Sequence, residues 1–362
     1  MNVSEARILF ITRQMDRGGT EKVILSLCEI LKPLVHNIVV CSSGGAQTKI
    51  LSDMGITHYT IPDFSDKKFG TVLKTLRIIH RIVRREHISV IHAHARMAAV
   101  YAHIYGKFFH IPVIATAHNV FGDKKRLTYF AYHNIRVVAC GKSVLDNLVD
   151  FYGLEKTRVY LINNGVKESI NDITPVSEIQ RCKETGGFAI AICGRLCKEK
   201  AVDVAIKAMS DAKVRTKNIQ LFIVGEGEER TYLQDIVQSK GLCEKVHFLG
   251  YRTDVPNIMK QVDLCVQTSV IEGLPLVLIE AQATALPVVA TAIPGTTDVI
   301  VDGFNGKLVP VNDEKKLAET ILFFEENLDI RKEYAENARE QYVKHFSHQM
   351  FAKKYIQFYE EL

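Results

Sequence analysis

The sequence lacks any long apolar run. No stretch of about 18 consecutive apolar residues occurs in its 362 residues, so we expect no membrane-spanning helix. The first residues, MNVSEARILFI, lack the apolar region and small-residue cleavage site of a secretory signal, so we expect no signal peptide. The eight cysteines never form CxxC, which favours reduced, mostly buried thiols in a cytoplasmic protein over a disulfide framework or a zinc site.

Two motifs of nucleotide-binding enzymes are also missing. The loop after the first predicted strand, RGGTEK (17–22), does not have the GxGxxG spacing of a dinucleotide site, which disfavours an NAD-dependent oxidoreductase. No DxD-type metal motif occurs either. We therefore expect no cofactor and no metal.

Charge is distributed unevenly along the chain, although the net charge is only +5. Residues 1–170 hold 23 Lys and Arg and 13 Asp and Glu, a net charge of +10, whereas residues 171–362 carry −5. A basic half joined to an acidic half indicates that one half meets an anionic partner.

Apolar runs alternate with helical segments along the whole chain. The runs are nearly continuously apolar, which is typical of parallel strands covered on both faces, and the alternation predicts an α/β protein with doubly wound sheets. The runs are RILFI, NIVVC, THYTI, SVIHA, PVIAT, RVVAC and VYLIN in the first half, and FAIAIC, IQLFIV, VHFLG, DLCVQ, PVVAT and GKLVP in the second.

The length and the pattern predict two domains. Because each half begins with a strand, a loop and a helix, we expect an amino-terminal domain at 1–168 and a carboxyl-terminal domain at 169–345. The polar segment 167–187 lacks a strand pattern and is predicted to be the linker. The aromatic spacing of residues 346–362 predicts a helix that packs back on the first domain.

The segment EGLPLVLIE places two carboxylates, Glu272 and Glu280, around an uncharged run. Pro275 suits the first position of a helix, and the helix would carry Glu280 more than one turn inside. The free N–H groups of Leu276 and Val277 would lie between the carboxylates and could bind phosphate. The segment therefore fits a ligand with hydroxyls at both ends and phosphate between them, and it equally fits an ordinary acidic helix start.

Two loops that follow predicted strands are candidate phosphate sites. GRLCKEK (194–200) places Arg195 and Lys200 where a diphosphate could bind both, although an ordinary solvated basic loop has the same composition. RGGTEK offers glycines that let backbone approach a phosphate, and a plain turn explains it as well. GEGEER (225–230) is predicted to be a tight turn.

Histidines end two predicted strands, in HAHAR (92–96) and TAHN (116–119). His92 and His94 share one face of their strand. His118 is the stronger candidate for function, because the GDKK that follows is typical of a mobile loop. A structural role for each histidine and a three-histidine metal site stay open as alternatives.

The segment 69–87 has a strongly amphipathic helical pattern. Its apolar stripe comprises Val72, Leu73, Leu76, Ile79, Ile82 and Val83, and its opposite face carries Lys74, Arg77, Arg81, Arg84 and Arg85. The basic face fits attraction to anionic lipid headgroups, and it also fits a solvated outer face of a core helix.

Taken together, these motifs resemble those of GT-B glycosyltransferases, and most closely family 4 of the retaining enzymes (glycosyl transferases group 1). The resemblance covers nearly the whole chain. It implies two Rossmann-like doubly wound domains that face each other across a cleft. The similar motifs are RGGTEK, VIHAHAR, TAHN, NNGV, GRLCKEKAVDVAI, IVGEGEE, FLGYRTDV, EGLPLVLIEA, PVVAT, PGTTDVI and GKLVPVND.

The resemblance implies a role for each matching residue. The catalytic candidates are Glu272, His118, Arg195 and Lys200, and the donor-binding candidates are Gly19, Arg195, Lys200, Glu272, Leu276, Val277 and Glu280. In this interpretation Glu272 binds hydroxyls of the donor sugar and Glu280 binds the ribose. Arg195 and Lys200 neutralise the diphosphate with help from backbone N–H groups, and the FLGYR loop (248–252) lies near the base. One departure is Ala201, where the family commonly has glycine.

The implied activity is transfer of a hexose-type sugar from a UDP-sugar or other NDP-sugar to a lipid-linked or glycan acceptor. Cations and amides would stabilise the leaving diphosphate without a metal, and surface polysaccharide or glycan biosynthesis is the expected pathway. We expect a cytoplasmic enzyme, peripheral at the inner face of the cell membrane, that binds no nucleic acid. A nucleotide-sugar epimerase of the same architecture and a non-catalytic sugar-nucleotide-binding protein are the alternatives.

Overall fold

The protein divides into two compact units, each of them built around one parallel sheet. The computed structural model describes residues 2–66, 68–168 and 172–362. Unit 1 comprises Met1–Asn164 and Gln349–Leu362, and unit 2 comprises Gly165–His348. The domain boundary that the sequence places after residue 168 adjoins residues 169–171, which lie outside the described residues.

Unit 1 contains a seven-stranded sheet in the order β3-β2-β1-β4-β5-β6-β7, and every neighbouring pair is parallel. The central strand β4 is buried along its whole length, as expected for a strand covered on both faces. The strands are β1 Arg7–Ile11, β2 Asn37–Ser42, β3 Thr57–Thr60, β4 Val90–His94, β5 Val113–Ala117, β6 Arg136–Ala139 and β7 Val159–Leu161. The seven runs predicted from the sequence are confirmed as strands.

Unit 2 contains a six-stranded sheet in the order β10-β9-β8-β11-β12-β13, again with parallel neighbours. Its strands are β8 Phe188–Cys193, β9 Ile219–Val224, β10 Val246–Gly250, β11 Leu264–Gln267, β12 Val288–Thr291 and β13 Gly306–Val309. Two Rossmann-like α/β units were predicted, and both are confirmed.

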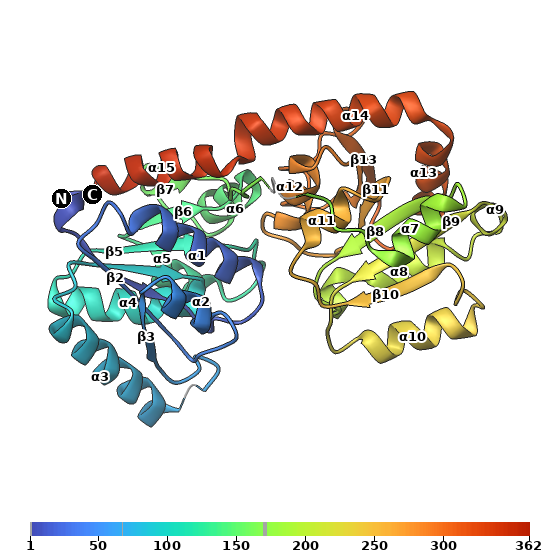
Figure 1. Ribbon diagram of the computed structural model, residues 1–362. Helices are drawn as coiled ribbons and strands as arrows, with labels where there is room; N and C mark the ends of the chain where they lie inside the picture. The colour runs from blue at the N-terminus through green and yellow to red at the C-terminus, as the bar shows by residue number, and fades with distance from the viewer. Residues whose placement is uncertain (1, 67, 169–171) are drawn as a thin grey trace. The chain divides into compact units, whose positions relative to one another are not determined.

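Helices alternate with the strands in both units (Figure 1). In unit 1 they are α1 Gly19–Leu31, α2 Thr48–Asp53, α3 Phe69–Arg85, α4 Arg96–Phe109, α5 Lys125–Tyr132 and α6 Lys142–Asp146, and α15 His348–Glu360 begins at the unit boundary. In unit 2 they are α7 Ser177–Glu184, α8 Val202–Ala208, α9 Ala212–Thr216, α10 Arg230–Ser239, α11 Val255–Met259, α12 Leu276–Ala283, α13 Glu314–Glu326 and α14 Leu328–Gln341.

Part of the predicted linker is a helix of unit 2. Helix α7 lies within the polar segment 167–187 and buries Ile179 and Cys182. The sequence prediction was wrong here because an eight-residue helix with only two buried apolar positions gives too weak a periodic pattern.

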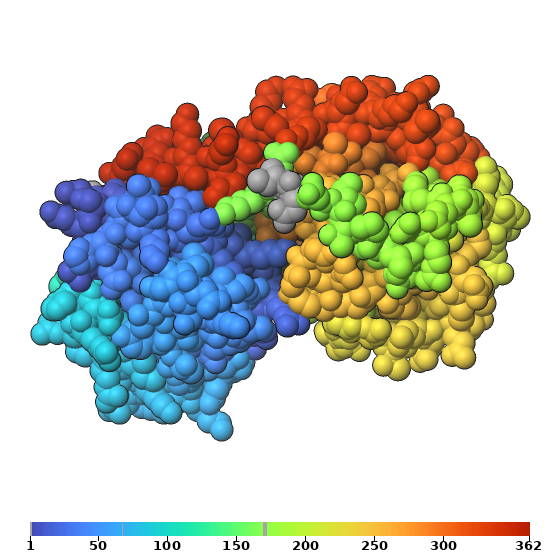
Figure 2. Space-filling model, viewed as in Figure 1, coloured from blue at the N-terminus to red at the C-terminus, as the bar shows by residue number. Residues whose placement is uncertain are grey.

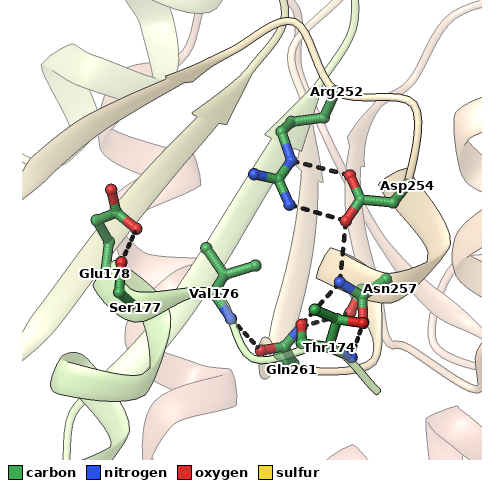
Figure 3. Close-up of polar contacts among 8 residues, drawn as sticks. All are labelled: Thr174, Val176, Ser177, Glu178, Arg252, Asp254, Asn257 and Gln261. Carbon is green, nitrogen blue, oxygen red and sulfur yellow. Dashed lines mark hydrogen bonds and ion pairs between the residues drawn. The ribbon is translucent and has the colours of Figure 1, made fainter. Parts of the chain in front are cut away.

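Just upstream of α7, the chain is hydrogen-bonded by the side-chain amides of Asn257 in α11 and of Gln261, which follows α11 (Figure 3). Asn257 accepts a hydrogen bond from Thr174 N and donates one to Thr174 O, both at 2.9 Å. Gln261 accepts one from Val176 N, also at 2.9 Å. Asp254, at the start of α11, accepts two hydrogen bonds from the guanidinium of Arg252. These bonds, together with one from Asn257, lower the pKa of Asp254 to about 2. Residues 174–176 are therefore held against the rest of unit 2.

The carboxyl-terminal helix α15 packs on unit 1 (Figure 2). It buries Phe351, Tyr355, Phe358 and Tyr359. Phe358 contacts the ring of Tyr160 edge-on at 4.9 Å between centroids. The two tyrosine hydroxyls reach the sheet itself, where they bond residues of β4 and β5.

Two features bear on the sequence predictions. Across the described ranges, no helix is both long and apolar enough to cross a bilayer. The eight cysteines, all within the described ranges, form no disulfide; seven are buried and Cys243 is exposed.

Candidate active site

The strand order of unit 2 reverses between β8 and β11. Ligands of open α/β sheets bind beyond the carboxyl ends of the strands at such a reversal. A small pocket lies at this point, formed by the end of β8, the loop that follows it and the end of β11. Its polar lining comprises Gly194, Arg195, Lys200, Gln267, Thr268 and Ser269.

Lys200, which lines this pocket, forms an ion pair with Glu272. The same oxygen of Glu272, Oε1, accepts hydrogen bonds from Ser269 Oγ at 2.7 Å and from Gln267 Nε2 at 3.0 Å. The Glu272 side chain is 11% exposed and that of Lys200 is 27% exposed. Three donors therefore hold the carboxylate in a largely desolvated place.

The sequence interpretation named Lys200 and Glu272 but missed Gln267 and Ser269. A signal for both was present, because polar residues follow the apolar strand DLCV directly at the carboxyl end of β11.

Arg195 lies exposed on the loop after β8. Partial burial acts to lower the pKa of its guanidinium. The hydrogen bond with Cys197 and the charges of Glu228 and Glu199 outweigh burial and raise the pKa. Arg195 is therefore a permanent cation at the pocket, and its planar guanidinium suits an anion with several oxygens.

Ala201, which follows Lys200, has φ +44° and ψ 45°. This left-handed conformation costs a residue with a Cβ roughly 1–2 kcal/mol, which explains why glycine suits the position. Alanine nevertheless adopts it here. The turn is held by hydrogen bonds from Thr268 Oγ1 to Lys200 O at 3.0 Å and from Val270 N to Glu199 O at 2.9 Å.

The eight-residue helix α12 begins at Leu276, four residues after Glu272. Pro275 is its N-cap rather than its first residue, so the predicted start was one position early. The N–H groups of Leu276 and Val277 lie in the first turn, where helix geometry provides no acceptor within the helix. Both residues are partly exposed, and N–H groups at a helix start suit an anion.

Glu280 lies inside α12 and is only 7% exposed. Burial, followed by the nearby Glu280 carboxylate, raises the pKa of Cys265 on β11 to about 12. Glu280 therefore lies against the sheet. Because Glu272 precedes α12 by four residues, the spacing of the two carboxylates cannot be derived from helical rise alone.

Two glycines allow other loops to touch the pocket loops. Gly225 has φ +147°, and a Cβ there would lie 1.8 Å from the carbonyl oxygen of Gly194. Gly295 has φ +85°, and a Cβ there would lie 2.3 Å from the carbonyl oxygen of Gly273. The GEGEER segment is thus more than a tight turn, because its backbone supports the loop that carries Arg195.

The other two candidate residues, Gly19 and His118, belong to unit 1. Its strand order reverses between β1 and β4. Gly19 is exposed and begins α1 after the loop that follows β1. His118 follows β5 directly and is 8% exposed. Burial lowers the pKa of His118 to about 4, so the ring is neutral at pH 7.

The loop after His118 is held in place, contrary to the expectation of a mobile segment. Arg96 pairs with Asp123 at 2.8 Å and lies over the Phe121 ring at 4.4 Å. Asn147 exchanges two hydrogen bonds with the Phe121 backbone at 3.1 and 3.0 Å, and the Tyr152 hydroxyl donates to Asp123 O at 2.9 Å. Sequence composition suggested mobility because these partners come from distant segments.

The three-histidine alternative can be compared with the observed geometry. His92, His94 and His118 do come together, but the contacts of their ring nitrogens are to one another and to tyrosine and threonine hydroxyls. Within the part of the chain that the structure describes, no group of three or more His, Cys, Asp or Glu side chains could hold a metal ion.

Comparison with known proteins places both halves of the chain among glycosyltransferases. Residues 17–169 match the model of Glycosyltransferase Family 4, and residues 178–341 match that of Glycosyl transferases group 1. A UDP-Gal:alpha-D-GlcNAc-diphosphoundecaprenol alpha-1,3-galactosyltransferase of Escherichia coli is 24% identical over 321 residues, covering 82% of each chain. The phosphatidylinositol N-acetylglucosaminyltransferase GPI3 subunit of Saccharomyces cerevisiae is 24% identical over 302 residues, covering 78% of this chain and 67% of the relative.

Solved structures share the fold. Anabaena Alr3699/HepE in complex with UDP and glucose superposes with a TM-score of 0.85 at 21% identity, covering 99% of this chain and all of that one. WaaG, a glycosyltransferase involved in lipopolysaccharide biosynthesis, superposes with a TM-score of 0.75 at 16% identity, covering 96% of this chain and 98% of that one. Each half of the chain therefore matches a glycosyltransferase family model, and the fold is that of GT-B glycosyltransferases.

Proposed function

We propose that the protein is a retaining, metal-independent glycosyltransferase. It moves a hexose-type sugar from a UDP-sugar, or another NDP-sugar, to a lipid-linked or glycan acceptor in surface polysaccharide or glycan biosynthesis. The observation that carries the proposal is the ion pair between Glu272 and Lys200, which lines the pocket at the strand reversal; α12 begins four residues after Glu272. Support comes from relatives, since the E. coli enzyme is named for UDP-Gal and a diphospholipid and the Anabaena structure contains UDP.

The arrangement suits a diphosphate joined to a sugar. Arg195, Lys200 and the N–H groups at the start of α12 would stabilise the negative charge that grows on the diphosphate as the sugar–phosphate bond breaks. Glu272, adjacent to Lys200, would bind hydroxyls of the sugar, and Glu280 would bind the ribose. Gly19 and His118 would contribute from unit 1.

We assign no covalent role to Glu272, whose Oε1 is already engaged by three donors. In the proposed front-face route, the acceptor hydroxyl oxygen bonds to the anomeric carbon as the bond to the diphosphate breaks. The hydroxyl proton passes to the leaving diphosphate oxygen. Trapping of a glycosyl–Glu272 adduct would contradict this route.

The function is tested with the full chain and a panel of nucleotide-sugars. A donor that binds the native state is expected to raise the melting temperature, and UDP release should then require an acceptor glycan or glycolipid. Conversion of the donor without any acceptor would instead indicate an epimerase. Stable UDP binding without turnover on any acceptor would indicate a non-catalytic binding protein.

We further propose that the enzyme is cytoplasmic and peripheral at the inner face of the cell membrane, with α3 as its contact. Ile79, Ile82 and Val83 face the core, whereas Leu73 of the predicted apolar stripe remains 37% exposed. The five basic residues of the opposite face, Lys74, Arg77, Arg81, Arg84 and Arg85, are all exposed. Among the described residues, the first four form no ion pair, so their charge is available to an anionic partner.

Replacement of Arg77, Arg81 and Arg84 by Gln is expected to weaken binding to vesicles of phosphatidylcholine and phosphatidylglycerol. Each arginine near an anionic surface contributes about 1 kcal/mol, and the effect should shrink as salt screens the charges. Cosedimentation with vesicles measures it. The matched control replaces the exposed Lys213, Lys315 and Lys332 of unit 2 by Gln, which removes the same net charge. Equal binding by the two triple variants would reject α3 as the contact.

A further inference from the structure

Three histidines of adjacent strands form a stacked row at the carboxyl ends of β4 and β5. The ring centroids of His92 and His94 are 4.5 Å apart, and those of His94 and His118 are 5.3 Å apart. His92 and His94 are fully buried, and only His118 retains some exposure. The row lies beside the strand reversal of unit 1, where a ligand of such a sheet is expected.

The inner end of the row is fully bonded. His92 Nδ1 lies 2.7 Å from the hydroxyl of Tyr359, and His92 Nε2 lies 2.8 Å from Thr116 Oγ1. Thr116 Oγ1 in turn lies 3.0 Å from the hydroxyl of Tyr355. Helix α15 thus fixes the position of His92, against which His94 stacks.

His94 differs from His92 because only one of its nitrogens has a partner. His94 Nδ1 lies 3.0 Å from His118 Nε2, whereas His94 Nε2 is enclosed and has no hydrogen-bond partner. Burial, with the charges of His92 and His118 adding to it, lowers the pKa of His94 well below its usual range. The rings of His94 and His118 are therefore both neutral at pH 7, and each carries one proton on one of its two nitrogens.

The unpaired nitrogen decides where these protons lie. If His94 carried its proton on Nε2, a buried N–H would have no acceptor, which proteins rarely tolerate. If the proton is on Nδ1 instead, the group left unpaired is a lone pair, which costs less. His94 then donates from Nδ1 to His118 Nε2, and the single proton of His118 must lie on its Nδ1.

We infer that His94 is a positioning residue that holds His118 in the Nδ1–H tautomer, so that His118 offers a hydrogen-bond donor, and no base, to its ligand. Nδ1 of His118 has no partner among the described residues and is not an enclosed atom, so it is open to a ligand. The group it recognises is an oxygen acceptor, such as a sugar hydroxyl or a phosphate oxygen.

The inference deepens the proposed function and rests on it in one respect, namely that the ligand of His118 is the sugar donor. A donor N–H at this place cannot take the acceptor's proton. This agrees with a route in which that proton passes to the leaving diphosphate oxygen.

The tautomer is measured directly by long-range ¹H–¹⁵N correlation of the imidazole rings in the full, ligand-free chain near pH 7. Loss of one ring's signals in His118→Gln assigns them to His118. We expect a protonated-type Nδ1 and an unprotonated-type Nε2 for this ring. A His118 that is protonated on Nε2 would overturn the inference, whatever the activity of the protein.

The role of His94 is tested by His94→Phe, which keeps a ring of similar size without the donor. We expect His118 to change from a single tautomer to a mixture. His94→Asn, whose amide can donate from nearly the position of Nδ1, should restore the single form. A His118 tautomer that is unchanged in folded His94→Phe would show that His94 does not set it, and if that variant does not fold, the wild-type measurement still decides. Because no nucleotide-sugar is needed, failure here is distinct from failure of the proposed function.

Discussion

Replacement of Lys200 by alanine is expected to lower turnover at least about 100-fold, as is Arg195→Ala or Glu272→Ala. Loss of a single preorganised donor to a developing negative charge has effects of this size in other enzymes. Lys200 and Glu272 form one ion pair, so replacing either of them also leaves its partner without a counter-charge in a partly desolvated place. The measurement is steady-state release of UDP with a saturating donor and acceptor.

The pair predicts a characteristic double-mutant result. Because Lys200 orients Glu272, the loss in Lys200→Ala combined with Glu272→Gln should be well below the product of the two single losses. Glu272→Gln alone preserves the shape of the side chain while removing its charge. Multiplicative losses would show that the two residues act independently in the reaction.

Lys198 provides the matched control, since it lies two residues from Lys200 in the same loop and is exposed. Lys198→Ala is expected to change turnover less than about twofold, as a solvated charge away from the pocket contributes little. Melting temperatures of all variants separate lost catalysis from lost folding. Near-normal turnover of the Arg195, Lys200 and Glu272 variants together would remove this pocket as the active site.

The strands and the loops that end them could be predicted from the sequence, because buried parallel strands leave a continuous apolar signal. Lys200 and Glu272 could be named from the motifs around them. Their ion pair could not be foreseen from the motifs. It depends on β8 and β11 being neighbours in the sheet, although 70 residues lie between the end of β8 and the start of β11. Gln267 and Ser269 escaped notice for the same reason.

The histidine row illustrates the same limit in unit 1. HAHAR and TAHN each identified histidines at a strand end, but the pairing of His94 with Thr116 in the ladder between β4 and β5 is what brings His118 against His94. The clamp of Arg96 on the following loop depends on contacts with Phe121 and Asp123, which no local pattern encodes. Local composition therefore predicted mobility where tertiary contacts give order.

The stability of unit 1 is expected to fall steeply as the pH is lowered from about 7 to about 5. Burial lowers the pKa of His92 to about 3 and that of His118 to about 4, and it lowers that of His94 as well. In the unfolded chain these rings regain their ordinary pKa of about 6.5. Between these values the unfolded state binds more protons than the folded state, so acid favours unfolding.

These pKa shifts determine the direction in which stability changes with pH and the pH range in which it changes. The stabilising effect of neutral, buried rings is fully present above pH 6.5 and is lost as the pH falls toward the folded pKa values. As the pH falls through this range, each ring lowers the free energy of unfolding by up to about 1.4 kcal/mol per pH unit. Carboxylates contribute mainly below their ordinary pKa values near 4, so the range from pH 7 to pH 5 reports chiefly on histidines.

Urea unfolding near pH 7, 6 and 5 measures the effect, and single variants assign it. His58, His103 and His247 also have pKa values lowered by burial, so the wild-type slope alone does not identify the row. His118→Asn removes one proton-binding ring and should reduce the slope by up to about 1.4 kcal/mol per pH unit, whatever its effect on stability at pH 7. An equal slope in wild type and His118→Asn would mean that His118 is not buried as a neutral ring in the folded protein.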